Sequence, residues 1–286
     1  MVLWRRFLIA ACVLAGGLMA SGWVRGLALA ERGNRARMGF EMGGIEVGVL
    51  ALALALAIAL PGSVPRRLGL QPSRLSHWAF AAVVLGTLGL SLAMNALVDA
   101  MAVAEGSNMT GISRGLAAPP DARSIWIAVF GTALLPGIAE ELLCRGVVQR
   151  SLVAWIHPLV AIAVSTLLFG ALHMELVHGG VAFLIGLYLA VTAFWADSTR
   201  PAIAAHVANN GLALAGSVGF LQLRATHGTM LVLGLGLAAA GAYAAYRHRL
   251  PRGPRGPRGE ARKDPGNAPE DLPEPGLQQR GKSAEV

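Results

Sequence analysis

The sequence contains little charge and little cysteine. Only 14% of its 286 residues are Asp, Glu, Lys or Arg and 55% are hydrophobic, whereas a typical soluble domain has about 25% charged residues. The two cysteines, Cys12 and Cys144, stand far apart in apolar surroundings. Without a C-x-x-C pair or a Cys/His cluster, neither a disulfide framework nor a thiolate zinc site is indicated. This composition excludes a soluble enzyme.

The sequence contains long runs of apolar residues without charged side chains. Because about 20 apolar residues cross a bilayer, the runs predict an all-α, polytopic integral membrane protein with about eight transmembrane helices. The runs at 47–65 and 124–139 are short for this role: Pro61 interrupts the first, and the second spans only if it continues past charged residues. The eight runs are 7–24, 47–65, 75–98, 124–139, 151–174, 176–196, 201–223 and 225–246.

The basic residues indicate which side of the membrane is cytoplasmic. Arg5 and Arg6, the loop around Arg66, and the segment 247–263 with its seven basic residues all predict a cytoplasmic location, because cytoplasmic loops carry the excess of Lys and Arg. Both termini would then be cytoplasmic. The loop 25–46, with four arginines, would lie outside and conflicts with this rule.

The net charge of +8 and the pattern of residue use suggest the cellular setting. The basic excess lies beside a membrane segment, so we expect the lipid bilayer as a partner and no nucleic acid. Arginine outnumbers lysine 22 to 2 and Ala and Gly abound, which is typical of a GC-rich bacterial genome. A bacterial inner membrane, crossed several times, is the expected location.

Ionisable residues in the apolar runs require an explanation, since each costs about 2.5–3.5 kcal/mol in a spanning helix on insertion scales. Glu140 and Glu141 are followed by Arg145. Glu141 and Arg145 are four residues apart and can pair on one helix face. Glu140 is rotated by about 100° around the axis and points elsewhere. One acid is therefore expected to be structural and the other available for chemistry.

Two further apolar runs carry polar residues at the same four-residue spacing. Phe169 and His173 share one face, and His206 and Asn210 share another. At about 1.5 Å per residue, Glu140 and His173 differ in depth by only about 7 Å, whereas His206 would lie about 6–14 Å nearer the cytoplasmic surface. The estimated depths therefore allow Glu140 and His173 to lie in one layer of the membrane. They do not decide whether His206 reaches the same layer. A single intramembrane His or Asn can also serve only to pack helices.

Two other protease signatures do not fit. His173 and His178 are five residues apart with Glu175 out of register, so they cannot form the His-Glu-x-x-His zinc face. The stretch Gly111-Ile112-Ser113-Arg114-Gly115 matches Gly-x-Ser-x-Gly, but a nucleophile turn needs a strand before it and a helix after it. We interpret that stretch as part of an external loop.

The three polar patterns resemble a known family. Glu140-Glu141-x-x-x-Arg145, Phe169-x-x-x-His173 and His206-x-x-x-Asn210 match, in order, the three motifs of the CPBP family. This family unites CAAX prenyl endopeptidases with bacteriocin-processing and Abi-type membrane proteins. The similarity covers about residues 124–217.

The resemblance implies an intramembrane endopeptidase. In such an enzyme the residue matching Glu140, helped by the one matching His173, activates water, and those matching His206 and Asn210 stabilise the oxyanion. These side chains suit the chemistry, because a carboxylate can act as a general base. Each hydrogen-bond donor directed at the oxyanion stabilises the transition state by roughly 2.7–4 kcal/mol. Glu141 and Arg145 would orient the site, and Phe169 would pack beneath His173.

Several alternatives stay open at this level. The family is often labelled metalloprotease, and Glu140, His173 and His206 are the set that would hold a divalent metal such as zinc; the resemblance to the prenyl endopeptidases favours a site without a cofactor. The substrate would be a peptide or membrane-protein precursor. A non-catalytic scaffold, an immunity or maturation protein, or a proton-coupled transporter would also use intramembrane Glu and His.

The sequence divides into three parts. Residues 1–123 hold the N-terminal transmembrane helices and an external loop, and residues 124–250 hold the CPBP-like catalytic core. From Pro251 the chain is rich in Pro, Gly and Arg and cannot bury enough apolar surface to fold. Residues 251–286 are therefore expected to be a disordered cytoplasmic tail.

Overall fold

The computed structural model describes residues 35–60, 62–105, 107–117, 122–221 and 225–250. Contacts divide the chain into residues 1–250 and residues 251–286, and all described residues belong to the first unit. They form helices, and no strand occurs among them apart from a single isolated bridge between Leu75 and Arg249. The all-α prediction is confirmed. The predicted span 7–24 and the predicted tail lie outside the described residues.

The helices differ widely in length, and two segments of π-helix interrupt the central one. The π-helical segments are η1 (Val129–Leu134) and η2 (Leu142–Gln149). The α-helices of the described residues are α2 (Arg35–Ala59), α3 (Val64–Arg67), α4 (His77–Ala100), α5 (Asn108–Leu116), α6 (Ala122–Ala128), α7 (Leu135–Glu141), α8 (Arg150–Val153), α9 (Pro158–Ala171), α10 (Leu176–Ala196), α11 (Arg200–Ser217) and α12 (His227–Arg247).

Five described segments are long and apolar enough to cross a membrane, which makes this a multi-pass membrane protein. They are Ala36–Ala59, His77–Ala100, Ala122–Val153, Leu176–Ala196 and His227–Arg247. The predicted number of eight is not confirmed. α9 has only 14 residues because it begins at Pro158, after a turn, and ends just before Met174, whose φ is +54°. α11 has 18 residues and is the most polar of the long helices.

One predicted boundary was wrong: residues 35–46 were expected in a loop but form the first turns of α2. The 124–139 run continues past its charged residues to Val153, which is the condition under which it was expected to span the membrane. Glu46, Glu140 and Arg145 are all buried inside the protein. A charged side chain in a spanning helix is tolerated when it faces the bundle interior, so neither helix has to end where the apolar run ends.

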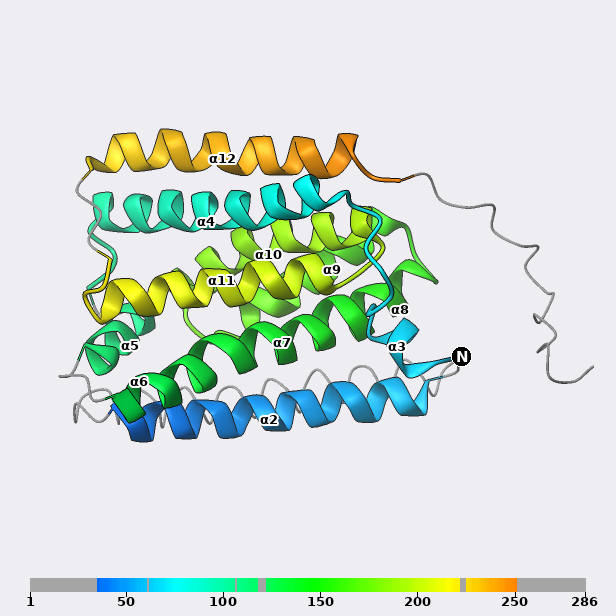
Figure 1. Ribbon diagram of the computed structural model, residues 1–286, viewed down its shortest axis with the longest axis horizontal. Coiled ribbons are helices and arrows are strands. Elements are labelled where there is room, and N and C mark those ends of the chain that lie inside the picture. The colour runs from blue at the N-terminus through cyan, green and yellow to red at the C-terminus, as the bar shows by residue number, and fades with distance from the viewer. Residues whose placement is uncertain (1–34, 61, 106, 118–121, 222–224, 251–286) are drawn as a thin grey trace, which may run out of the picture. The chain divides into compact units, whose positions relative to one another are not determined.

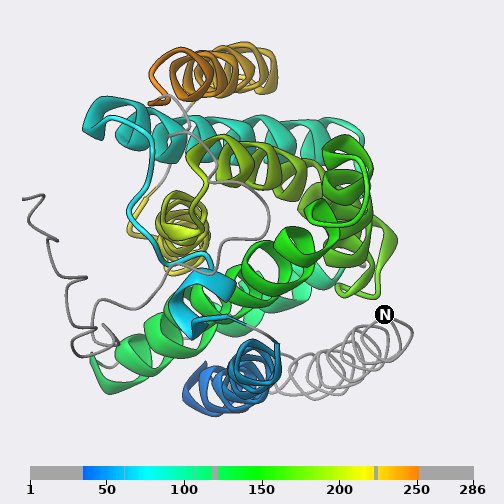
Figure 2. The same cartoon turned by 90° about the vertical axis from the view of Figure 1, so that its right-hand side faces the viewer.

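The long helices run between two ends of the bundle. α4 and α12 lie side by side, and α11 lies between α4 and α7 (Figures 1 and 2). At one end, loops far apart in sequence are joined by backbone hydrogen bonds: Thr199 N–H donates to the Gly69 carbonyl and Leu250 N–H donates to the Arg74 carbonyl, both at 2.8 Å. We call this the arginine-rich end, since it holds Arg66, Arg67, Arg74, Arg150, Arg200, Arg247 and Arg249.

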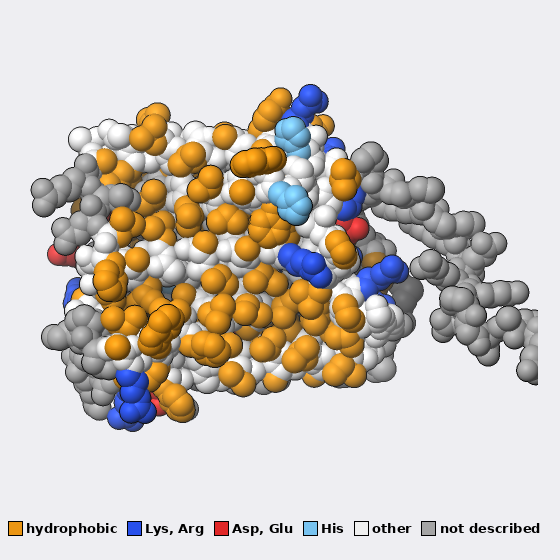
Figure 3. All heavy atoms as spheres, in the orientation of Figure 1, with side chains coloured by type: hydrophobic (Ala, Val, Ile, Leu, Met, Phe, Trp, Pro, Cys, Tyr) orange, Lys and Arg blue, Asp and Glu red, His pale blue; other side chains and the backbone are white. Residues whose placement is uncertain are grey.

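The other end is formed by α5 and the neighbouring loops. The stretch Gly111–Gly115, expected in a loop, lies in the short helix α5, which begins after the N-cap Ser107. Ser113 on α5 and Ser217 at the end of α11 are hydrogen-bonded at 3.0 Å. Between the two ends, the face shown in Figure 3 is covered mainly by hydrophobic side chains, and the charged side chains gather toward the ends. This distribution suits a protein surrounded by lipid.

A close helix contact yields a stability prediction. A Cβ at Gly131 in η1 would collide with the backbone carbonyl of Gly39 in α2, whereas nothing lies within 4 Å of a Cβ at Gly236 in α12. Gly131→Ala should therefore destabilise the protein by about 1–3 kcal/mol through overpacking. Gly236→Ala should be neutral or stabilising by up to about 1 kcal/mol. Thermal unfolding in detergent measures both, and equal melting temperatures would contradict this packing.

Candidate active site

The segment from Ala122 to Val153 carries the first polar motif. Glu140 and Glu141 end α7, and Arg145 lies in the π-helical segment η2 that follows. π-Helical turns are rare and occur frequently at functional sites. Glu140 is 5% exposed and Glu141 is 0% exposed, so both carboxyl groups are inside the protein.

Glu141 is the centre of a buried polar network. Its Oε1 accepts hydrogen bonds from Arg145 Nη1 and from His206 Nδ1, both at 2.9 Å. Arg145 also donates from Nη2 to the Gly186 carbonyl at 2.8 Å, and its guanidinium carbon lies 4.2 Å from the centre of the Phe169 ring. The predicted Glu141–Arg145 pairing is confirmed. The network joins the central helix to α9, α10 and α11.

Glu140 points in another direction, as the helix geometry predicted. It lines a cavity, and its Oε2 lies 3.9 Å from His206 Nε2. Among the described residues, that Oε2 has no hydrogen-bond partner. Glu140 therefore borders the cavity, and its carboxyl group keeps the capacity to accept a hydrogen bond there.

His173 lies in the turn after α9. Its Nδ1 donates to the carbonyl of Phe169 at 3.0 Å, and this bond orients the ring and leaves the lone pair on Nε2. The Phe169 ring packs edge to face against His173, with centroids 5.2 Å apart, and against His206, with centroids 5.8 Å apart. Phe169 thus separates and supports the two imidazoles.

The sequence does not determine how deep His206 lies in the membrane. In the structure its depth follows from the position of α11. Thr199, next to the helix start, is buried beneath the loop before α4: its Oγ1 donates to the Leu68 carbonyl at 2.7 Å, and its N–H donates to the Gly69 carbonyl at 2.8 Å. This contact fixes the start of α11 against the loop before α4, at the arginine-rich end. His206 reaches the same cavity as Glu140 and His173.

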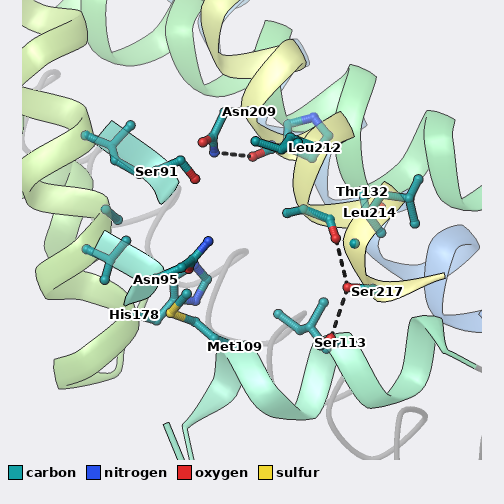
Figure 4. Close-up of a pocket in the computed structure, with 18 of the residues that line it drawn as sticks. Ser91, Asn95, Met109, Ser113, Thr132, His178, Asn209, Leu212, Leu214 and Ser217 are labelled. Carbon is teal, nitrogen blue, oxygen red and sulfur yellow. Dashed lines mark hydrogen bonds between the residues drawn. The ribbon is translucent and has the colours of Figure 1, made fainter. Parts of the chain in front are cut away.

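Asn210 also lines this cavity, one turn after His206. Its Oδ1 accepts a hydrogen bond from Asn209 Nδ2 at 3.2 Å, the upper dashed line in Figure 4. With the carbonyl oxygen engaged in this way, the amide NH₂ of Asn210 is left as the donating group. Asn209 was not predicted as a site residue, although it directly precedes one.

The cavity that these residues share has a volume of about 570 Å³ and lies between α4, α5, α7, α10 and α11. Its walls are mainly apolar, with a few amides and hydroxyls. Figure 4 shows Ser91 and Asn95 on one side and Asn209, Thr132 and Ser217 on the other. A mostly apolar cavity with a few convergent polar groups is typical of a ligand or active site.

Sequence reasoning missed Glu46. It is 3% exposed on α2 and lines the same cavity as Glu140. The signal in the sequence was a single acid at the border of the 47–65 run, which the assignment of residues 25–46 to a loop concealed.

His178, at the start of α10, lines the cavity as well, and the centroid of its ring lies 4.5 Å from that of His173.

The arrangement does not fit a metal ion. Among the residues that the structure describes, no three His, Cys, Asp or Glu side chains are placed so that they could hold one. Glu140, His173 and His206, the set named from the sequence, surround a cavity but do not form a ligand set.

The buried Glu141–Arg145 pair predicts a large loss of stability when one partner is removed. Arg145→Met leaves the buried Glu141 carboxylate without its guanidinium partner, with His206 Nδ1 still bonded to it, and should cost about 3–5 kcal/mol. Arg150→Met, which removes the partly exposed pair with Asp197 at 3.1 Å, should cost about 0–1 kcal/mol. Thermal unfolding in detergent compares the two, and similar losses would contradict the burial of the first pair. Adding Glu141→Leu to Arg145→Met should restore part of the loss, because no charge is then left alone.

No curated protein and no solved structure gives a significant match to the chain. Residues 122–212 match the family described as type II CAAX prenyl endopeptidase Rce1-like. That segment runs from the start of α6 into α11 and includes all three polar motifs. This match confirms the resemblance to the CAAX protease family for residues 122–212.

Proposed function

We propose that this protein is an intramembrane endopeptidase of the bacterial cell membrane that cleaves a peptide or membrane-protein precursor with a water molecule activated by Glu140. The observation that carries the proposal is the gathering of Glu140, His173, His206 and Asn210, from separate helices, around one buried cavity. The domain match supports a protease at the level of the family.

The reaction begins with water held between Glu140 and the scissile carbonyl. Glu140 takes a proton from the water as its oxygen attacks the carbonyl carbon, and the carbonyl electron pair moves to oxygen. When the tetrahedral intermediate collapses, the carbon–nitrogen bond breaks and the proton passes from Glu140 to the departing amine. One water is consumed for each peptide bond, and Glu140 returns to its starting state.

The other cavity residues act on the charges that develop. Asn210 donates to the oxyanion through its amide NH₂. Because the Nδ1–H of His206 is bonded to Glu141, His206 donates to the oxyanion from Nε2 only in the imidazolium form, which this step requires. His173 lines the same cavity and helps to orient the attacking water. No step of this proposal uses a metal ion.

Glu46 positions Glu140 in this scheme. Both side chains line the cavity, and in this proposal a protonated Glu46 donates a hydrogen bond to the Glu140 carboxylate. That bond would fix the rotamer of the base. Glu46 lies on α2 and therefore outside the segment that matches the family.

Glu140→Gln should abolish cleavage while the protein still folds and inserts into the membrane. A positioned general base contributes about 10²- to 10⁴-fold, and the amide cannot take the proton. The measurement is comparative proteomics of cells that carry the normal chain or Glu140→Gln, in which an uncut precursor should accumulate only with the variant. Phe169→Leu, which keeps an apolar side chain between the imidazoles, serves as the control that retains activity. Cleavage by Glu140→Gln at the normal rate would refute the mechanism.

Chelation tests the absence of a metal step directly. Activity of the purified protein should be unchanged after treatment with a strong chelator of divalent ions, because no residue set holds such an ion. Loss of activity that returns on adding a divalent metal, with no change in melting temperature, would contradict the proposal.

Glu46→Leu and Glu46→Gln separate positioning from a structural role. The leucine removes the donor to Glu140 and should lower kcat by about tenfold to a hundredfold, the equivalent of about 1.5–3 kcal/mol, with KM little changed. The glutamine still donates through its amide and should rescue most of the activity. Glu41→Leu, on the same helix but away from the cavity, is the matched control. Equal activity of the leucine and glutamine variants would exclude the positioning role.

A further inference from the structure

The cavity reaches one end of the bundle and not the other. Besides the residues around Glu140 and His206, it is lined by Asp99 in the last turn of α4, by Ala104 after that helix, by Ser113 on α5 and by Ser217 at the end of α11. No residue of the loops 61–76, 197–200 or 247–250, which form the arginine-rich end, lines it. A substrate that approaches from water therefore meets the cavity at the α5 end.

The two ends differ in positive charge. Among described side chains, seven arginines lie at the arginine-rich end, whereas Arg37, Arg114 and Arg123 lie at the α5 end. Since Lys and Arg near helix ends mark the cytoplasmic side, the α5 end is extracytoplasmic.

Among the residues that the structure describes, the cavity has no permanently charged cation, Lys or Arg, to pair with an acidic group. Glu46, Asp99 and Glu140 line it together with three histidines, His173, His178 and His206, and no Lys or Arg does among the described residues. Burying a substrate carboxylate beside these acids without a cation would be costly. The walls offer neutral amides and hydroxyls instead, among them Asn95 and Ser113.

We propose that the cavity takes its substrate from the extracytoplasmic side of the membrane and that this substrate is a peptide segment of neutral or positive charge. The identity of the substrate as a peptide rests on the proposed function; the side of access and the charge preference rest on the cavity. A precursor segment that emerges outside the cell meets both conditions. A cytoplasmic C-terminus with a free carboxylate meets neither.

Single cysteines test the side of access without requiring cleavage. Asn95→Cys places a thiol in the cavity, Val103→Cys is exposed at the α5 end, and Ser63→Cys is exposed at the arginine-rich end. The native Cys144 is buried, and the unsubstituted chain gives the background. The probes are two small membrane-impermeant methanethiosulfonates, one carrying a trimethylammonium group and one a sulfonate.

In intact cells the cationic reagent should label Asn95→Cys and Val103→Cys, and Ser63→Cys should react only after the membrane is permeabilised. Labelling of Asn95→Cys only after permeabilisation, or its failure under both conditions, would overturn the proposed side of access. Labelling of Ser63→Cys in intact cells would overturn the orientation.

The ratio of the two reagents tests the charge preference. Because a cleft of one sign concentrates ions of the opposite sign by about tenfold or more, the cation-to-anion rate ratio should be about tenfold higher at Asn95→Cys than at Val103→Cys. Equal ratios would overturn the charge preference. In a Glu140→Gln background the side of the membrane from which each cysteine is labelled should stay the same, so a failure of the proposed side of access is distinguishable from a failure of the proposed catalysis.

Discussion

The carboxylate of Glu141 is the group on which the rest of the site depends. It is fully buried and has two donors, Arg145 and His206, that come from different helices. A buried charge is stable only when it is paired and hydrogen-bonded, so these helices must approach one another for the chain to fold in a membrane. The same contacts hold His206 at the cavity and place Arg145 over Phe169. The contacts that the chain needs in order to fold are therefore the same contacts that assemble the site.

The polar residues also explain how acidic helices are accommodated in lipid. Glu46, Glu140 and Glu141 all face the interior, and the close contact of Gly131 with Gly39 lets α2 approach the central helix backbone to backbone. Small residues at such contacts are typical of membrane helix packing. The cost of burying the acids is offset by contacts with other protein groups rather than by water at the membrane surface.

Much of this was predictable from the sequence, because helix periodicity is local. The spacing of Glu141 and Arg145 predicted their pair, and the rotation of Glu140 away from it predicted that Glu140 faces elsewhere. What could not be predicted depends on contacts between segments distant in sequence. The depth of His206 follows from the burial of Thr199 under the Leu68 carbonyl, and the role of Glu46 follows from the approach of α2 to the central helix. Neither contact leaves a repeating pattern in the chain.

The central claim is that Glu140 delivers water directly to a peptide carbonyl, with no covalent intermediate on the protein. A single turnover of the purified protein with its precursor in water enriched in oxygen-18 tests this most directly, by mass spectrometry of the product and of the protein. We predict one solvent oxygen in the new C-terminal carboxyl group of the product and none in the Glu140 side chain. Label in the Glu140 carboxyl group, or an acylated form of the protein during turnover, would contradict the account.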